Sequence, residues 1–166
     1  MHTWKEIEYF DNEWKDRIQL MASYIHPTIK SIMDIGCGKM WLKDYLQPGC
    51  KYFGVDYIDR GVDSYVFDLN NYEFPDFFCD LAFVSGCLEY IDDYKWLLRK
   101  ICTQNRVCII SYCIFDVFND LKERRKLHWK NQLTERELID LFVDNDMHLT
   151  DKDKTDTQNY IYVFTR

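Results

Sequence analysis

The chain has 166 residues, of which 47% are hydrophobic and 17% aromatic, and its formal net charge is −7 at pH 7. This is enough apolar sequence for one folded domain with a core, so an intrinsically disordered chain is excluded. The acidic balance argues against a nucleic-acid partner, and no apolar run is long enough to span a membrane. We therefore expect a single domain over residues 1–166.

The cysteines argue against a disulfide framework and against a zinc site. There are seven of them, an odd number, and no two form a Cys-x-x-Cys pair. Several lie in apolar, strand-like runs, where cysteine behaves as a small hydrophobic residue. This usage fits a reducing compartment, so we expect a cytoplasmic protein without a bound metal.

The first 27 residues predict one amphipathic helix that ends at His26-Pro27. Its apolar positions recur at helical spacing: Trp4, Ile7, Trp14, Ile18, Met21 and Ile25. We expect these side chains to pack against the core.

The stretch Ser31–Met40 predicts a strand, a tight turn and a helix that continues to Leu46. Gly36 and Gly38 suit the turn because glycine tolerates positive φ and lets a ligand approach the backbone. N–H groups at a helix start favour electron-rich ligand groups. Trp41 stands where a dinucleotide fingerprint needs a small residue, which argues against pyrophosphate binding.

A second strand, Lys51–Asp56, also ends in a carboxylate. Asp56 lies about twenty residues beyond the glycine turn, the spacing at which a strand-end carboxylate accepts hydrogen bonds from ribose hydroxyls. Two further strands are expected at Ser64–Leu69 and Asp80–Ser85. Asp68 alone also reads as an aspartate that begins a turn before Asn70-Asn71.

The sequence Asp-Ile-Gly-Cys-Gly at 34–38 resembles motif I of the class I S-adenosylmethionine-dependent methyltransferases, although Met40 replaces a third glycine that is common there. The segment 85–91 resembles motif IV, where Ser85 would lie beside the transferable methyl and Glu89 would be a functional or a structural carboxylate. The resemblance implies that Asp68 and Leu69 face the adenine. It assigns cofactor binding to Asp34, Gly36, Cys37, Gly38, Asp56, Tyr57, Asp68, Leu69 and Ser85.

The next predicted elements are a helix over Asp92–Cys102 and a buried strand over Arg106–Tyr112. An irregular basic segment over 114–133 follows, and then a helix that begins at the capping box Thr134–Glu137. Two closing strands, Met147–Asp151 and Tyr160–Phe164, have too short a connection for a parallel crossover and should be antiparallel.

The basic segment contains two candidates for contact with a substrate. Arg124 and Arg125 would engage an anionic group of the acceptor from a mobile lid; the other reading is a solvated helix face. His128 is the leading candidate for a catalytic base, ahead of Tyr112 and Asp116, although a surface histidine fits the position as well.

These elements predict an α/β fold: a single doubly wound, mostly parallel sheet with helices on both faces and a C-terminal antiparallel strand, seven-stranded as in the resembling family. Residues 1–27 form the N-terminal helix, 31–112 the cofactor-binding half, and 113–166 the substrate-side segment and closing strands. The implied function is methyl transfer from S-adenosyl-L-methionine to an oxygen or nitrogen of a small-molecule or sugar-type acceptor. A catalytically degenerate binding subunit and a nucleotide-sugar oxidoreductase remain as alternatives.

Overall fold

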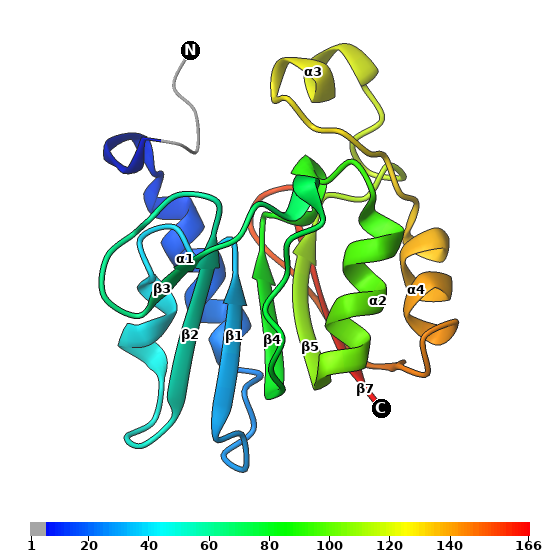
Figure 1. Cartoon of the computed structure of the whole chain (residues 1–166). Helices are drawn as coiled ribbons and strands as arrows, with labels where there is room; N and C mark the ends of the chain where they lie inside the picture. Colours follow the sequence, from blue (N-terminus) through cyan, green and yellow to red (C-terminus); the bar gives the residue numbers. More distant parts are fainter. Residues whose placement is uncertain (1–5) are drawn as a thin grey trace.

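A seven-stranded sheet in the order β3-β2-β1-β4-β5-β7-β6 forms the centre of the molecule in a computed structural model, which describes residues 6–166 (Figure 1). All pairings among β1 to β5 are parallel, and β7 is antiparallel to both β5 and β6. The predicted fold, including its C-terminal antiparallel strand, is confirmed. The strands are β1 (Ser31–Ile35), β2 (Lys51–Asp56), β3 (Ser64–Val66), β4 (Cys79–Ser85), β5 (Asn105–Tyr112), β6 (His148–Lys154) and β7 (Tyr160–Thr165).

Helices cover both faces of this sheet. The α-helices are α1 (Asn12–Ala22), α2 (Tyr94–Gln104), α3 (Leu121–Lys126) and α4 (Glu135–Val143). Within residues 6–166 there are also four 3-10 helices, η1 to η4, at Ile7–Tyr9, Trp41–Tyr45, Leu69–Asn71 and Leu88–Tyr90. Among the described residues, none of these helices has the length and apolar character needed to cross a membrane.

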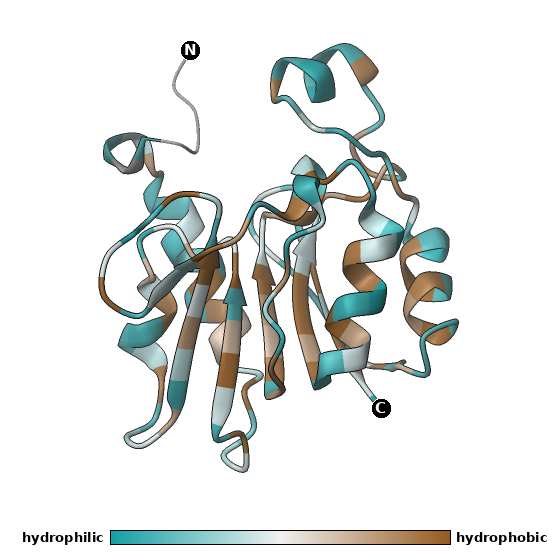
Figure 2. Ribbon diagram, viewed as in Figure 1, coloured by the Kyte–Doolittle hydropathy of each residue, from teal (hydrophilic) through white to brown (hydrophobic). Residues whose placement is uncertain are grey.

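Successive side chains along a strand point to opposite faces of the sheet, and each face carries its own apolar cluster. Ile32 points into the cluster that also contains Met21 of α1, whereas its neighbour Met33 points into the cluster with Leu98 of α2 and Phe142 of α4. The strands between them are therefore apolar on both sides, as expected for buried parallel strands. Figure 2 shows hydrophobic residues along these strands and on α2 and α4.

Two of the elements predicted between Lys39 and Leu69 are shorter than the sequence indicated. The expected helix Lys39–Leu46 is only the 3-10 helix Trp41–Tyr45. The few residues before Pro48-Gly49 form too few hydrogen bonds to offset the free-energy cost of starting an α-helix. The third strand ends at Val66 instead of Leu69. Asp68 accepts a hydrogen bond from Asn70 N at 3.0 Å and so caps a 3-10 helix.

The helix ends follow their capping residues. The predicted single helix up to His26-Pro27 is wrong in its bounds, because the described chain forms the 3-10 helix η1 and then a separate helix α1, which ends at Ala22. α1 begins at Asn12, where the Asp11 carboxylate accepts from Glu13 N at 3.0 Å, and the predicted start at Trp4 lies outside the described residues. α2 begins after Asp93, whose carboxylate accepts from Trp96 N. The predicted capping box of Thr134 and Glu137 is confirmed at the start of α4.

The expectation that Arg124 engages an acceptor is wrong. Its side chain is only 2% exposed and donates to the carbonyl oxygens of Cys113, Phe118 and Asn131 at 2.9–3.2 Å. Its guanidinium also lies 4.8 Å from the centroid of the Trp129 ring. Since neighbouring residues of a short helix point in different directions, Arg125 remains exposed. Arg124 thus ties the irregular segment 113–131 together.

This difference between adjacent arginines predicts different effects on stability. Arg124→Met leaves several buried carbonyl groups without their donor, so the free energy of unfolding should fall by about 2–4 kcal/mol. Arg125→Met is the matched control and should change it by less than about 0.5 kcal/mol. Urea denaturation of the three proteins measures both values, and equal effects of the two substitutions would contradict the structural role of Arg124.

Candidate functional site

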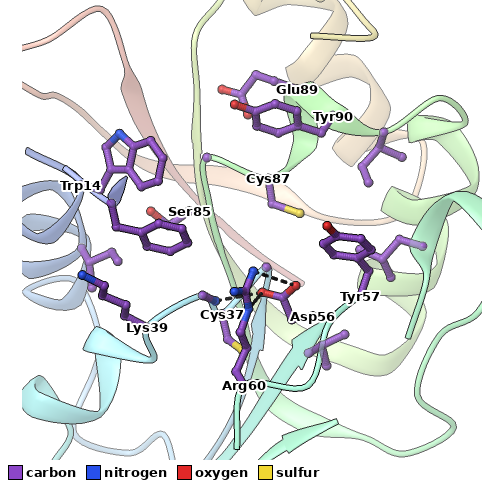
Figure 3. Close-up of a pocket in the computed structure, with 18 of the residues that line it drawn as sticks. Trp14, Cys37, Lys39, Asp56, Tyr57, Arg60, Ser85, Cys87, Glu89 and Tyr90 are labelled. Carbon is purple, nitrogen blue, oxygen red and sulfur yellow. Dashed lines mark hydrogen bonds and ion pairs between the residues drawn. The ribbon is translucent and has the colours of Figure 1, made fainter. Parts of the chain in front are cut away.

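A cavity of about 270 Å³ lies at the carboxyl ends of β1, β2 and β4 (Figure 3). Three turns supply its floor: Gly36–Gly38 after β1, Asp56-Tyr57 at the end of β2, and Ser85–Cys87 at the end of β4. These turns meet because parallel strands deliver their carboxyl ends to the same edge of the sheet, which is where α/β proteins bind ligands. Of the predicted cofactor residues, the cavity is lined by Gly36, Cys37, Gly38, Asp56, Tyr57, Leu69 and Ser85.

Both glycines of the first turn are required by their backbone conformation and by their neighbours. Gly36 has φ +74°, and a Cβ there would lie 2.8 Å from Cys87 Cβ. Gly38 has φ +48°, and a Cβ would lie 2.4 Å from Cε2 of Phe10. A side chain at either position would therefore be strained and would displace part of the cavity wall.

The N–H groups of this turn are already used within the protein. Gly36 N and Cys37 N donate to the carbonyl of Val55 at 2.8 and 3.1 Å, and Gly38 N donates to Oδ2 of Asp56 at 3.1 Å. These three N–H groups are therefore not free for a ligand, and the expectation for the N–H groups at the start of the following helix stays a prediction. The three residues of the turn line the cavity, so a ligand there would meet their backbone.

Asp56 has the most crowded carboxylate of the site. Oδ2 accepts from Gly38 N and from Nε of Arg60 at 3.1 Å each, and Oδ1 accepts from Ile58 N at 3.3 Å and from Nη2 of Arg60 at 3.5 Å. A carboxylate accepts about four hydrogen bonds in all. Figure 3 shows Arg60 directly beside Asp56. A ligand hydroxyl can therefore reach Asp56 only where Arg60 gives way.

Asp34 and Asp68 do not line the cavity. Asp34 is buried beneath the glycine turn, where it accepts a hydrogen bond from the Tyr52 hydroxyl at 2.6 Å. Burial raises the pKa of Asp34 to about 7, although the Tyr52 hydrogen bond opposes this. The Asp68 carboxylate caps η3 and accepts from Asn70 N and Asn71 Nδ2, while its neighbour Leu69 reaches the cavity. An adenine contact by Asp68 stays a prediction.

Two charged side chains, Arg17 and Glu89, lie in the cavity wall beside the end of β4. Nε of Arg17, on α1, donates to Oγ of Ser85 at 3.0 Å. Glu89 is 2% exposed, and its Oε1 accepts from Cys113 N at 3.1 Å. Burial raises the pKa of Glu89 and lowers the pKa of Arg17. The predicted Ser85 is thus held by an arginine of α1 for which the sequence indicates no role in the site.

Aromatic side chains close the cavity from the N-terminal side. The Phe10 ring lies 4.9 Å from Trp14 and 6.0 Å from Trp41, and Nζ of Lys39 lies 5.2 Å from the Trp41 ring. The helical spacing predicted core packing for Trp14, but Trp14 lines the cavity together with Phe10. Helical spacing alone could not separate a core position from a cavity wall.

His128 is exposed and does not line the cavity, whereas both of its neighbours, Leu127 and Trp129, do. Its backbone has φ +61°, in the left-handed region. The described residues contain no group of three or more His, Cys, Asp and Glu side chains placed to hold a metal ion.

The raised pKa of Asp34 predicts a pH dependence of stability. Its pKa is about 7 when folded and near 3.9 when unfolded, so the folded state binds the proton more tightly and loses stability as the pH rises from about 4 to 7. Asp34→Asn removes this loss and keeps an acceptor for Tyr52. As the pH rises through this range, the free energy of unfolding of the variant minus that of the wild type should therefore increase by up to about 1.4 kcal/mol per pH unit. Urea denaturation at several pH values measures this difference. A difference between variant and wild type that does not change with pH would contradict the raised pKa of Asp34.

Comparison with known proteins places this geometry in a family. A family profile described as "Methyltransferase domain" matches residues 6–149. This range contains all three turns of the cavity floor. No curated protein sequence shows a match to the chain.

Solved structures share the fold at low sequence identity. Magnesium protoporphyrin IX methyltransferase (ChlM) from Synechocystis PCC 6803, solved with bound SAH, has a TM-score of 0.74 and 15% identity, with coverage of 93% of this chain and 84% of that chain. A putative methyltransferase in complex with the Haloferax volcanii Trm112 activator also scores 0.74, at 14% identity and 93% and 90% coverage. Mitomycin 7-O-methyltransferase MmcR scores 0.71 at 15% identity, with 93% and 54% coverage. The chain belongs to the methyltransferase domain family, and it has the fold and the cofactor class, S-adenosylmethionine, of the class I methyltransferases.

Proposed function

We propose that this protein transfers a methyl group from S-adenosylmethionine to an oxygen or nitrogen of a small-molecule acceptor. The observation that carries the proposal is the pairing of a bare glycine turn with a buried carboxylate, Asp56, on one cavity floor. A nucleoside with an amino-acid end fits such a floor, because its hydroxyls need an acceptor and its chain needs close backbone approach.

The residues present fit this cofactor. Gly36–Gly38 would cradle the methionine part, Asp56 would accept the ribose hydroxyls, and Leu69 would border the adenine. Met40, which departs from the family pattern, has φ 54° and ψ 33° and does not line the cavity. A left-handed residue of this kind costs roughly 1–2 kcal/mol but leaves the cofactor space open. The departure therefore does not favour a degenerate binding subunit.

The bound cofactor supplies a methyl group on a sulfonium leaving group, so the protein mainly has to position the reactants and exclude water. Phe10 and Trp14 would exclude water on the side of α1. Tyr90 and Trp129 line the cavity together with Leu127 and would contact the acceptor, a sugar-type or aromatic small molecule. The similar structures named above include enzymes whose names give a porphyrin and mitomycin as acceptors, which supports a small molecule.

Proton removal from the acceptor would fall to His128, if a shift of the segment 127–129 carries it to the cavity. The neighbouring positions of Leu127 and Trp129 in the cavity wall support this role. An acceptor nitrogen or oxygen with a low pKa would not need the base.

Binding of S-adenosylhomocysteine, measured by calorimetry, tests the proposal. The wild type should bind this product, with NAD much weaker. Asp56→Asn keeps an acceptor for Gly38 N but removes the charge, so affinity should fall about ten- to a hundredfold.

Asp63→Asn is the matched control, since Asp63 is an exposed carboxylate after β2 that pairs with Lys43 and does not line the cavity. Its affinity should equal that of the wild type. Tight NAD binding without a response to S-adenosylhomocysteine would exclude the methyltransferase function.

A further inference from the structure

Glu89 lies in the cavity wall, yet the proposed function gives its carboxyl group no part. The residue belongs to η4, directly after β4, and is only 2% exposed. Figure 3 shows Glu89 beside Tyr90, at the end of the cavity away from Asp56. Tyr90 interacts in turn with Trp129, and both line the cavity. Glu89 therefore belongs to the end of the cavity where the acceptor would bind.

The two oxygens of this carboxyl group differ in their surroundings. Oε1 accepts from Cys113 N, directly after β5, at 3.1 Å. The backbone carbonyl of Glu89 accepts from Lys130 N at 2.7 Å, so the residue is fixed at both ends. Oε2 is buried, and within residues 6–166 no group donates a hydrogen bond to it. A buried acceptor without a donor is costly, so Oε2 is suited to bind a donor that a ligand supplies.

A structural role does not account for the carboxyl group. Glu89 joins the end of β4 to the end of β5, but this contact uses Oε1 alone. A glutamine would offer the same oxygen to Cys113 N without a group that can carry a buried charge. The second oxygen is therefore the feature of Glu89 that the fold leaves without a use.

Two guanidinium groups act on Glu89 without forming an ion pair with it. They belong to Arg17 of α1 and Arg124 of α3. Burial raises the pKa of Glu89, and these two cations oppose the shift because they favour the carboxylate. A cationic ligand would bring a third positive charge to the same carboxylate, whereas an uncharged donor adds none. The local charge balance thus favours an uncharged donor.

We propose that Oε2 of Glu89 accepts a hydrogen bond from an uncharged hydroxyl group of the methyl acceptor, a step that rests on the proposed function. Among the oxygen and nitrogen acceptors of that function, this contact selects an alcohol or a phenol over an amine that is protonated at neutral pH. Glu89 would thus determine specificity at the acceptor end of the cavity.

Three probes of similar size test this assignment. Benzyl alcohol carries an uncharged hydroxyl, benzyl methyl ether lacks the donor, and benzylamine is a cation at neutral pH. Their affinities are measured by NMR titration of the protein in the presence of excess S-adenosylhomocysteine. The wild type should bind benzyl alcohol about ten- to a hundredfold more tightly than the ether, because only the alcohol donates to Oε2. Benzylamine should bind more weakly than the alcohol, because Arg17 and Arg124 repel it.

Glu89→Gln keeps an acceptor for Cys113 N and replaces Oε2 by an amide nitrogen, which cannot accept a hydrogen bond. The ratio of alcohol affinity to ether affinity should therefore fall about ten- to a hundredfold, to near one. This ratio cancels the difference in size between the two probes. Glu123→Gln is the matched control and should keep the wild-type ratio, because Glu123 is an exposed carboxylate that pairs with Lys126 outside the cavity.

The inference is overturned if the wild type binds benzyl alcohol no more tightly than the ether or the amine, a comparison that needs no variant. It is also overturned if Glu89→Gln, shown to be folded by its melting temperature, keeps the wild-type ratio. Either result leaves the proposed function intact when the wild type binds S-adenosylhomocysteine. Absence of S-adenosylhomocysteine binding in the wild type contradicts the proposed function itself.

Discussion

The carboxylate of Asp56 is the interaction on which the site depends. It stands at the end of β2, and it holds the glycine turn after β1 through Gly38 N and the following loop through Ile58 N. Its charge is balanced by Arg60, whose side chain is 6% exposed. One buried group therefore fixes the distance between two strand ends and keeps an acceptor facing the cavity. Under the proposed function, the ribose hydroxyls would take the place of the arginine on this carboxylate, while the hydrogen bonds from Gly38 N and Ile58 N would stay.

Much of this arrangement could be predicted from the sequence. Short apolar runs that end in Asp34, Asp56 or Ser85 indicate parallel strands whose ends carry function, and the short final connection indicates an antiparallel strand. These signals are local, because each depends on a few consecutive residues. The positions of seven predicted cofactor residues in the cavity wall follow from the same topology.

The parts that the sequence could not provide depend on contacts between distant segments. Arg124 appears in a basic run with Arg125, but only the fold decides that one is buried among carbonyl groups and the other is exposed. Arg17 and Ser85 are 68 residues apart, and nothing in either local pattern predicts their hydrogen bond. Phe10 reaches the cavity because the chain before α1 passes over Gly38. In each case tertiary packing, and not periodicity, determines the role.

A crystal structure of the protein with S-adenosylhomocysteine tests the central claim most directly, because it shows what occupies the carboxylate of Asp56. We predict both ribose hydroxyl oxygens within about 3 Å of this carboxylate and the Arg60 guanidinium turned away from it. The hydrogen bond from Gly38 N to Asp56 should persist. A complex in which Arg60 still covers Asp56, with the ribose elsewhere, would contradict the account.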